Sequence, residues 1–232
     1  MTSPRGLVIT GASGTVGQAL LVQLTAALPS PIRALGRTPP ARLRPGDRFE
    51  RTDLSDPGAV TRAARHIAAG PPATGLVCAA GTDCRAGLAD FDPAALAYCL
   101  QVNCTAHLQL LQAVSRSRPA PATAIPVVLI SSDVIGQQIP ATLAYAAAKA
   151  AAEEALRHAA ADLCDPAVTI LIVRLPDIGI PMRAAAPGPP PPPRTSPRCQ
   201  LPVLSAAARA VSRFICDPPA AGLETWLETW HA

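Results

Sequence analysis

Short runs of consecutive apolar residues alternate with longer stretches of helical period along this chain. The runs predict strands near residues 6–10, 31–35, 47–51, 75–79, 125–131, 168–174 and 222–227. The longer stretches predict helices near residues 14–28, 56–69, 93–117, 143–163 and 203–216. Asp56-Pro57 and Asp92-Pro93 mark two of the helix starts, because an acidic cap followed by proline suits the first helical turn.

Strands and helices that alternate with short connections predict an α/β fold. We expect a single Rossmann-type domain over residues 1–232, with a doubly wound parallel sheet of about seven strands and helices on both faces. The 232 residues are too few for a second substrate domain of any size. Ligands of such sheets bind beyond the carboxyl ends of the strands. Gly11, Asp53, Gly81, Ser132 and Pro176 all follow predicted strands, so we expect them to converge.

A glycine-rich turn joins the first predicted strand to the first predicted helix. Leu7–Thr10 runs into Gly11-Ala12-Ser13-Gly14-Thr15-Val16-Gly17, and an apolar helical stretch follows. Glycines permit a tight turn and close backbone approach, while a helix N-terminus offers N–H groups and partial positive charge to a pyrophosphate. The alternative is a sharp turn that binds no ligand.

Cation usage singles out one further pair of residues. The chain has nineteen arginines and a single lysine, Lys149, which lies four residues after Tyr145, one of two tyrosines. On a helix this spacing places both side chains on one face. An ammonium beside a phenol favours the phenolate, so we expect Lys149 to lower the pKa of Tyr145. A surface pair on an amphipathic helix is the alternative.

With these motifs the chain resembles the short-chain dehydrogenase/reductase family from end to end. Thr10-Gly11-x-x-Gly14-x-x-Gly17 is similar to its cofactor loop, and Asp53-Leu54 to the pair that meets the adenine. Cys78-Ala79-Ala80-Gly81 is similar to its Asn-Asn-Ala-Gly segment. Asn103, Ser132, Tyr145 and Lys149 match its catalytic residues, and Ser132 precedes Tyr145 by the thirteen residues typical of the family.

The resemblance implies a role for each catalytic residue. Tyr145 exchanges a proton with the carbonyl oxygen, while Ser132 donates a hydrogen bond to that oxygen. Lys149 holds the nicotinamide ribose, and Asn103 holds a water that links Lys149 to solvent. Ser131 is an alternative to Ser132, and the thirteen-residue offset favours Ser132. The expected cofactor-binding residues are Gly11, Ser13, Gly14, Thr15, Val16, Gly17, Gly36, Arg37, Asp53, Leu54, Ala79, Ala80, Gly81, Tyr145, Lys149, Pro176 and Ile178.

Three departures from the family pattern stand out. The glycine spacing is closer to that of the family's extended and atypical branches than to its commonest pattern, and Cys78 replaces an asparagine that usually braces the central strands. Arg174-Leu175-Pro176-Asp177 replaces the usual Pro-Gly after the sixth strand.

The segment after the second strand predicts NADP(H) as the cofactor. An acid about twenty residues beyond the glycine loop would bind the ribose 2′-OH of NAD. No acid occurs before Asp47, and Arg37 stands where it would hold a 2′-phosphate instead. Arg42, Arg44 and Arg48 are interpreted as solvating residues.

Composition excludes several other classes. A net charge of +4 and 3% aromatic residues offer neither a basic stripe nor a stacking platform for nucleic acid. Seven cysteines without a C-x-x-C pair indicate free thiols, with no disulfide framework and no metal site. No signal peptide and no apolar run of membrane-spanning length is seen, so we expect a cytoplasmic protein without membrane contact.

Two further expectations concern assembly and substrate access. The helix that carries Tyr145 and Lys149 is nearly all small residues, and in similar proteins it pairs across a two-fold axis, which predicts a homodimer or homotetramer. Residues 184–202 form a proline-rich substrate-loop insertion with eight prolines. Proline removes backbone donors, so we expect an extended gate in place of a helical lid. A docking tag for a proline-binding domain is the alternative.

The sequence therefore predicts an NADP(H)-dependent ketoreductase or alcohol dehydrogenase that acts on a small to medium organic carbonyl or alcohol. An isomerase or dehydratase that uses Tyr145 with tightly held cofactor is one alternative, and a non-catalytic NADP(H) sensor is another. Loop residues expected near the pocket rim are Asp83, Arg85, Gln137 and Gln138. The histidines, read as structural or solvated and away from strand ends, are His66, His107, His158 and His231.

Overall fold

The structure is a computed structural model in which residues 6–118, 124–163, 168–178, 197–218 and 224–227 are described. Seven parallel strands form one sheet in the order β3-β2-β1-β4-β5-β6-β7. The strands are β1 (Gly6–Thr10), β2 (Ile32–Gly36), β3 (Arg48–Arg51), β4 (Ala73–Cys78), β5 (Ile125–Ser132), β6 (Val168–Leu175) and β7 (Glu224–Leu227). The doubly wound parallel sheet predicted from the sequence is thus confirmed.

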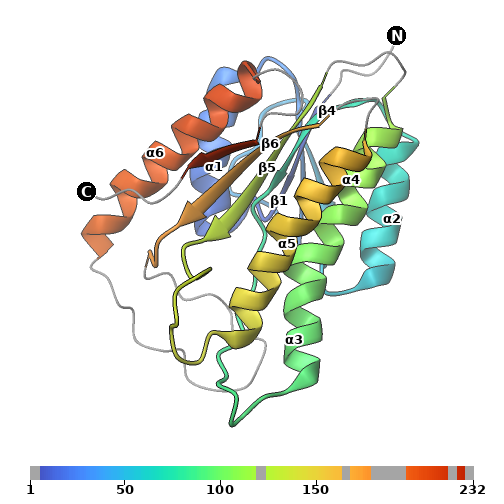
Figure 1. Cartoon of the computed structure of the whole chain (residues 1–232). Coiled ribbons are helices and arrows are strands. Elements are labelled where there is room, and N and C mark those ends of the chain that lie inside the picture. Colours follow the sequence, from blue (N-terminus) through green and yellow to red (C-terminus); the bar gives the residue numbers. More distant parts are fainter. Residues whose placement is uncertain (1–5, 119–123, 164–167, 179–196, 219–223, 228–232) are drawn as a thin grey trace.

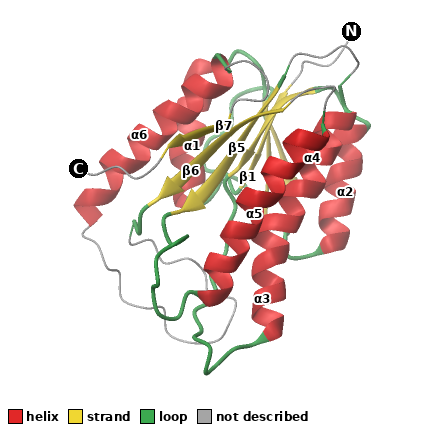
Figure 2. Cartoon of the chain, viewed as in Figure 1, coloured by secondary structure: helices red, strands yellow, loops and turns green. Residues whose placement is uncertain are grey.

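Helices cover both faces of the sheet (Figures 1 and 2). Helices α1 (Thr15–Ala27) and α6 (Pro197–Cys216) pack together on one face. The other face carries α2 (Pro57–Ala68), α3 (Pro93–Leu100), the π-helical turn η1 (Gln101–Thr105), α4 (Ala106–Arg116) and α5 (Leu143–Asp162). Among the described residues, no helix is long and apolar enough to cross a membrane.

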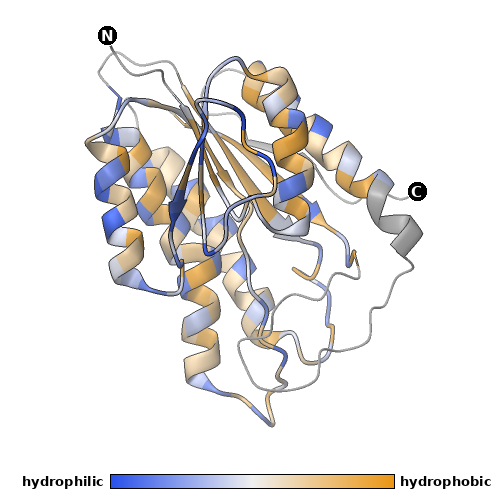
Figure 3. Cartoon of the chain, turned by 180° about the vertical axis from the view of Figure 1, so that it is seen from behind, coloured by the Kyte–Doolittle hydropathy of each residue, from blue (hydrophilic) through white to orange (hydrophobic). Residues whose placement is uncertain are grey.

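Strand side chains alternate between two hydrophobic cores, one beneath each helical layer. In β1, Leu7 and Ile9 join the core under α1 and α6, whereas Val8 joins the core under α2, α4 and α5. Every residue of β5 is buried, because both of its faces are covered. The edge strand β3 is instead polar, as its sequence RFER and Figure 3 show, which suits a strand with a free edge.

Several element boundaries can be compared with their predictions. The caps are confirmed, since Asp56 Oδ1 accepts from the Gly58 amide at 2.8 Å and Asp92 Oδ1 from the Ala94 amide at 2.9 Å. The single helix predicted over 93–117 is divided into α3, η1 and α4. Helix α6 begins at Pro197 rather than near 203 and has Pro202 inside it. The rest of the proline-rich segment, residues 184–196, lies outside the described residues.

Arg174, one of the departures from the family pattern, ties β6 to α5. Its Nε donates to Glu153 Oε1 at 3.0 Å and its Nη2 donates to Glu153 Oε2 at 2.6 Å. Glu153 is only 2% exposed, so this two-pronged ion pair is largely shielded from water. It fixes α5, which carries Tyr145 and Lys149, against the sheet.

Candidate active site

The glycine loop lies closely against the end of β4. Gly11 has φ +68°, and a Cβ added there would lie 2.6 Å from the Ala80 Cα atom. A Cβ at Gly17 would lie 2.1 Å from the Gly11 carbonyl oxygen. Both positions therefore require glycine. Helix α1 starts at Thr15 after the N-cap Gly14, which brings no side-chain oxygen to the first-turn amides, so these remain suited to an anion.

A buried hydrogen-bond chain holds the ends of β1 and β4 against the π-helical turn. The backbone amides of Ala79 and Ala80 donate to Thr10 Oγ1, each at 3.1 Å. Thr10 Oγ1 lies 3.2 Å from His107 Nε2, and His107 Nδ1 lies 3.2 Å from the Asn103 carbonyl oxygen. Burial, with help from Lys149, lowers the pKa of His107 to about 4. The imidazole is thus neutral, with Nδ1–H donating to Asn103 and Nε2 accepting from Thr10.

Asn103 sits inside η1 and is fully buried. Its side-chain amide donates to the carbonyl oxygens of Thr82 at 2.9 Å and Cys99 at 3.0 Å. Its Oδ1 accepts from the Thr82 amide at 3.1 Å. Asn103 therefore fixes the loop after β4 to the helix beside it, and a π-helical turn of this kind often marks a functional site.

Ser132, Tyr145 and Lys149 come together where β5 ends against α5. Lys149 Nζ donates to the Ile130 carbonyl oxygen at 2.8 Å and lies 5.8 Å from the centre of the Tyr145 ring. Ser132 is close enough to the phenol to act on the pKa of Tyr145, and its Oγ accepts from the Val134 amide at 3.2 Å. The convergence of serine, phenol and ammonium brings a proton donor beside a second hydroxyl and a cation.

Burial dominates the titration of this group. It lowers the pKa of Lys149 to about 8, because the charged ammonium loses its hydration. It raises the pKa of Tyr145 to about 12, with Ser132 acting in the opposite direction. The expectation that Lys149 depresses the phenol pKa is therefore not met in this structure. The phenol stays protonated at neutral pH and is available as a proton donor.

A cavity of about 920 Å³ joins the glycine loop to Tyr145. Every expected cofactor-binding residue lines it, from Gly11 to Ile178, and so do Ser132, Tyr145 and Lys149. Asn103 is not among the residues that line the cavity, but its side chain is hydrogen-bonded to Thr82, which does line it. The residues after β1, β3, β4, β5 and β6 converge on this cavity, as predicted, and Gly36 and Arg37 at the end of β2 join them.

The comparisons with known proteins agree with this geometry. Residues 6–187 match the family model described as short chain dehydrogenase. The chain belongs to the short-chain dehydrogenase family. It is therefore an oxidoreductase by family. A search of curated proteins gave no match.

Solved structures of the short-chain dehydrogenase family share the fold at low identity. An oxidoreductase from Brucella ovis, in complex with a partially ordered NAD, has a TM-score of 0.72 and 23% identity, covering 97% of this chain and 100% of its own. A short chain dehydrogenase from Burkholderia cenocepacia, in complex with NADP, has a TM-score of 0.72 and 21% identity, covering 99% and 90%. An NADPH-bound carbonyl reductase from chicken fatty liver has a TM-score of 0.62 and 18% identity, covering 75% and 79%.

Sequence reasoning missed several residues that line the cavity of this short-chain dehydrogenase. Thr38 follows β2, and its hydroxyl donates to Ser13 Oγ at 3.0 Å across the glycine loop. Arg51 ends β3 beside Gly36 and also lines the cavity. Both lie at the carboxyl ends of strands. The rule that ligands bind beyond these ends, which singled out Asp53, therefore applies to them equally. Asp83 and Arg85 do line the cavity, whereas Gln137 and Gln138 are not among its lining residues.

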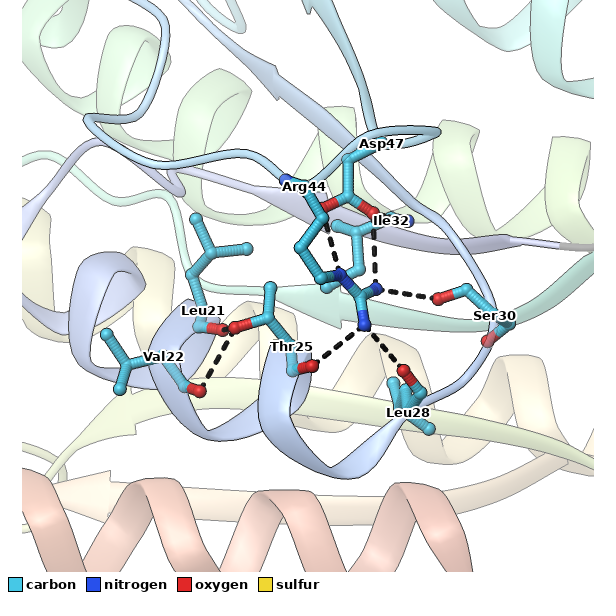
Figure 4. A network of polar contacts seen from close by, with 8 residues as sticks. All are labelled: Leu21, Val22, Thr25, Leu28, Ser30, Ile32, Arg44 and Asp47. Carbon is cyan, nitrogen blue, oxygen red and sulfur yellow. Dashed lines mark hydrogen bonds and ion pairs between the residues drawn. The ribbon is translucent and has the colours of Figure 1, made fainter.

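Two interpretations of single residues need correction. His107 was expected away from strand ends, yet it contacts Thr10 at the end of β1, because the long helix passes behind the sheet there. Arg44 was interpreted as solvating, but it is an anchor for the end of α1 (Figure 4). Its guanidinium donates to the carbonyl oxygens of Thr25, Leu28 and Ser30, and it pairs with Asp47 at 3.2 Å.

Proposed function

We propose that this protein is an NADP(H)-dependent ketoreductase or alcohol dehydrogenase that acts on a small to medium organic carbonyl or alcohol. The observation that carries the proposal is the convergence of Ser132, Tyr145 and Lys149 at the Tyr145 end of the cavity, whose other end is the glycine loop. Relatives of the fold that hold NAD or NADP, among them a carbonyl reductase, support a nicotinamide cofactor.

The residues present fit a dinucleotide. At Gly11 and Gly17, neighbouring backbone atoms lie where a side chain would have to be. The start of α1 lines the cavity beside these glycines, where its amides suit an anion. Within the described part of the chain, Lys149 uses one of its three donors on Ile130, which leaves two for the ribose hydroxyls. When bound, the cofactor supplies or accepts the hydride.

The protein's own groups handle the proton. Tyr145, protonated at neutral pH, donates its proton to the carbonyl oxygen as negative charge develops there. Ser132, which lines the cavity beside Tyr145, donates a second hydrogen bond to the same oxygen. Asn103 and His107 position this machinery from behind through Thr82 and Thr10. In alcohol oxidation the phenolate form of Tyr145 accepts the proton from the alcohol.

The preference for NADP(H) rests on the end of β2. Arg37 and Thr38 are exposed side chains that line the cavity, and Arg51 lines it from the end of β3. Burial acts to raise the pKa of Asp53, but the hydrogen bonds from Ser55 and, to a smaller extent, the charge of Arg37 hold that pKa below its usual value. Cations at this edge favour a 2′-phosphate, whereas NAD would need an acid that the segment lacks.

A panel of ketones and aldehydes with NADPH tests the proposal, followed by the loss of NADPH absorbance. Tyr145→Phe removes the proton donor and spares the helix, so turnover should fall by about 10²-fold or more while NADPH affinity stays. Ser131→Ala is the matched control for Ser132→Ala, because both serines line the cavity but only Ser132 stands thirteen residues before Tyr145. Turnover by Tyr145→Phe within a few-fold of the unaltered protein would refute the assignment.

A further inference from the structure

Lys149, the single lysine of the chain, lines the cavity with only 3% of its surface exposed. Its ammonium is surrounded by side chains from several elements, and β5 contributes the carbonyl oxygen of Ile130. Among the described residues, the titratable groups that interact with this ammonium are Cys78 of β4, Cys99 of α3, His107 of α4, and Tyr145 and Glu153 of α5. Arg174 of β6 reaches the group through its ion pair with Glu153.

Most of these neighbours of Lys149 are uncharged at neutral pH. Burial raises the pKa values of both thiols far above neutrality and that of Tyr145 to about 12, whereas it lowers the pKa of His107 to about 4. Glu153 is the exception, because its ion pair with Arg174 holds it as a carboxylate. Within the described part of the chain, Glu153 is therefore the charged group that acts on Lys149.

Glu153 lies one helical turn after Lys149, yet the two side chains are not paired. At this i,i+4 spacing a carboxylate and an ammonium can reach each other along a helix. Both carboxylate oxygens instead accept from Arg174, Oε1 from Nε at 3.0 Å and Oε2 from Nη2 at 2.6 Å. Lys149 Nζ donates to the Ile130 carbonyl oxygen at 2.8 Å, and the described residues show no ion pair between Lys149 and Glu153.

A buried carboxylate that loses its partner is strongly attracted to the next cation within reach. Glu153 is 2% exposed, and its other arginine, Arg157, lies 3.8 Å away and is shared with the exposed Glu154 at 2.6 Å. Lys149 is then the cation on the same face of α5. Resting on the proposed function, we propose that Arg174 is a positioning residue that holds Glu153 away from Lys149 and so keeps the ammonium free for the cofactor ribose.

The titration of Lys149 tests this proposal directly, because the chain has no other lysine. Lysine labelled with carbon-13 at Cε gives one side-chain resonance, whose shift against pH reports the protonation of Lys149 in the intact protein. Arg174→Met releases Glu153 to pair with Lys149, so the titration midpoint should rise by about one pH unit or more, because an adjacent opposite charge favours the ammonium. Glu153→Gln removes the carboxylate, so the midpoint should fall.

Matched variants separate this effect from a general change in charge. Arg62→Met and Glu154→Gln make the same charge changes at exposed positions and should leave the midpoint unchanged, because exposed charge is screened. Arg174→Gln keeps a hydrogen-bond donor and should give a smaller rise, which serves if Arg174→Met is poorly folded. A midpoint that stays unchanged in the Arg174 and Glu153 variants, or moves in the same direction in both, would overturn the proposal, since a purely mechanical link between α5 and β6 predicts lost stability alone.

NADPH binding supplies a second readout, measured by fluorescence below the Lys149 midpoint of each variant. Arg174→Met should bind NADPH about tenfold more weakly, because Lys149 then spends its donors on Glu153. The double variant Arg174→Met/Glu153→Gln should recover that affinity, since the competing carboxylate is gone. Failure to recover would contradict the proposal. Failure of the unaltered protein to bind NADPH would instead refute the proposed cofactor, while the lysine titration would still decide whether Arg174 keeps Glu153 from Lys149.

Discussion

Gly17→Ala is the substitution for which the structure gives the firmest expectation. The added Cβ would lie 2.1 Å from the Gly11 carbonyl oxygen and 2.8 Å from the Ala12 Cα atom. Ordinary contacts between such atoms are about 3.5 Å, so either helix α1 or the loop must move by more than a small adjustment. All of the nearby atoms belong to the backbone and have no rotamer with which to yield.

The loop has no room to retreat from α1. Gly11 is itself pressed against β4, since a Cβ there would lie 2.6 Å from Ala80 Cα and 2.7 Å from the Ala80 nitrogen. The Gly11 amide also donates to the Leu35 carbonyl oxygen at 3.0 Å, which fixes the loop to β2. We therefore expect a loss of about 2–4 kcal/mol in the free energy of unfolding, at or above the usual range for overpacking.

Two other glycines serve as matched controls in the same urea titration. A Cβ at Gly14 would lie 3.3 Å from the Gly11 oxygen, so Gly14→Ala should cost about 1 kcal/mol or less while it crowds the cofactor loop. Gly46 has φ +95° with open space around it, so Gly46→Ala should cost about 1–2 kcal/mol from backbone strain alone.

Cofactor titration completes the assay. Gly17→Ala should weaken NADPH binding together with stability, because the loop that must move is the one that we propose binds the pyrophosphate. Gly46→Ala should leave NADPH binding unchanged. A Gly17→Ala protein that is as stable as the unaltered one and binds NADPH equally well would refute the close packing between loop and helix.

Three further predictions rest on other parts of the structure. Glu153→Gln should lower the free energy of unfolding by about 2–4 kcal/mol, because Arg174 loses its buried partner, and urea midpoints against the exposed Glu154→Gln should show it. His107 is neutral in the fold with its pKa lowered to about 4, so stability should fall as pH drops from 6.5, by at most about 3 kcal/mol, and His107→Gln should flatten this decline in urea titrations at successive pH values. Arg37→Ala should reduce the preference for NADPH over NADH by about 1–3 kcal/mol in fluorescence titrations, and equal affinities in the unaltered protein would contradict it.

Motifs that depend on backbone geometry were readable from the sequence. The glycine loop, the two Asp-Pro helix starts and the alternation of strands each follow from local rules on turns, caps and periodicity. They place the strand ends together without further information, which is why the cofactor-binding residues named from the sequence all line one cavity. The fold was predictable to that extent.

Contacts between distant segments were not readable in the same way. His107 looks like one polar residue on an amphipathic helix, and nothing local reveals that Thr10, 97 residues earlier, lies opposite its ring. Arg44 stands in an arginine-rich segment, and its partnership with the end of α1 depends on how the connection after β2 folds back. Asn103, in the π-helical turn that divides the long helix, is likewise hydrogen-bonded to Thr82, which lies 21 residues earlier in the loop after β4.

Tyr145 shows that a sequence motif can predict where two side chains lie without predicting the pKa values that they have there. Tyr145 and Lys149 share a face of α5 as their spacing predicts, yet the ammonium is held by the Ile130 carbonyl oxygen and is itself costly to charge at this depth. The acids Asp83 and Asp133 act against ionisation of the phenol from two other loops. A Tyr145 that stays protonated beside these acids is suited to giving a proton to a carbonyl oxygen.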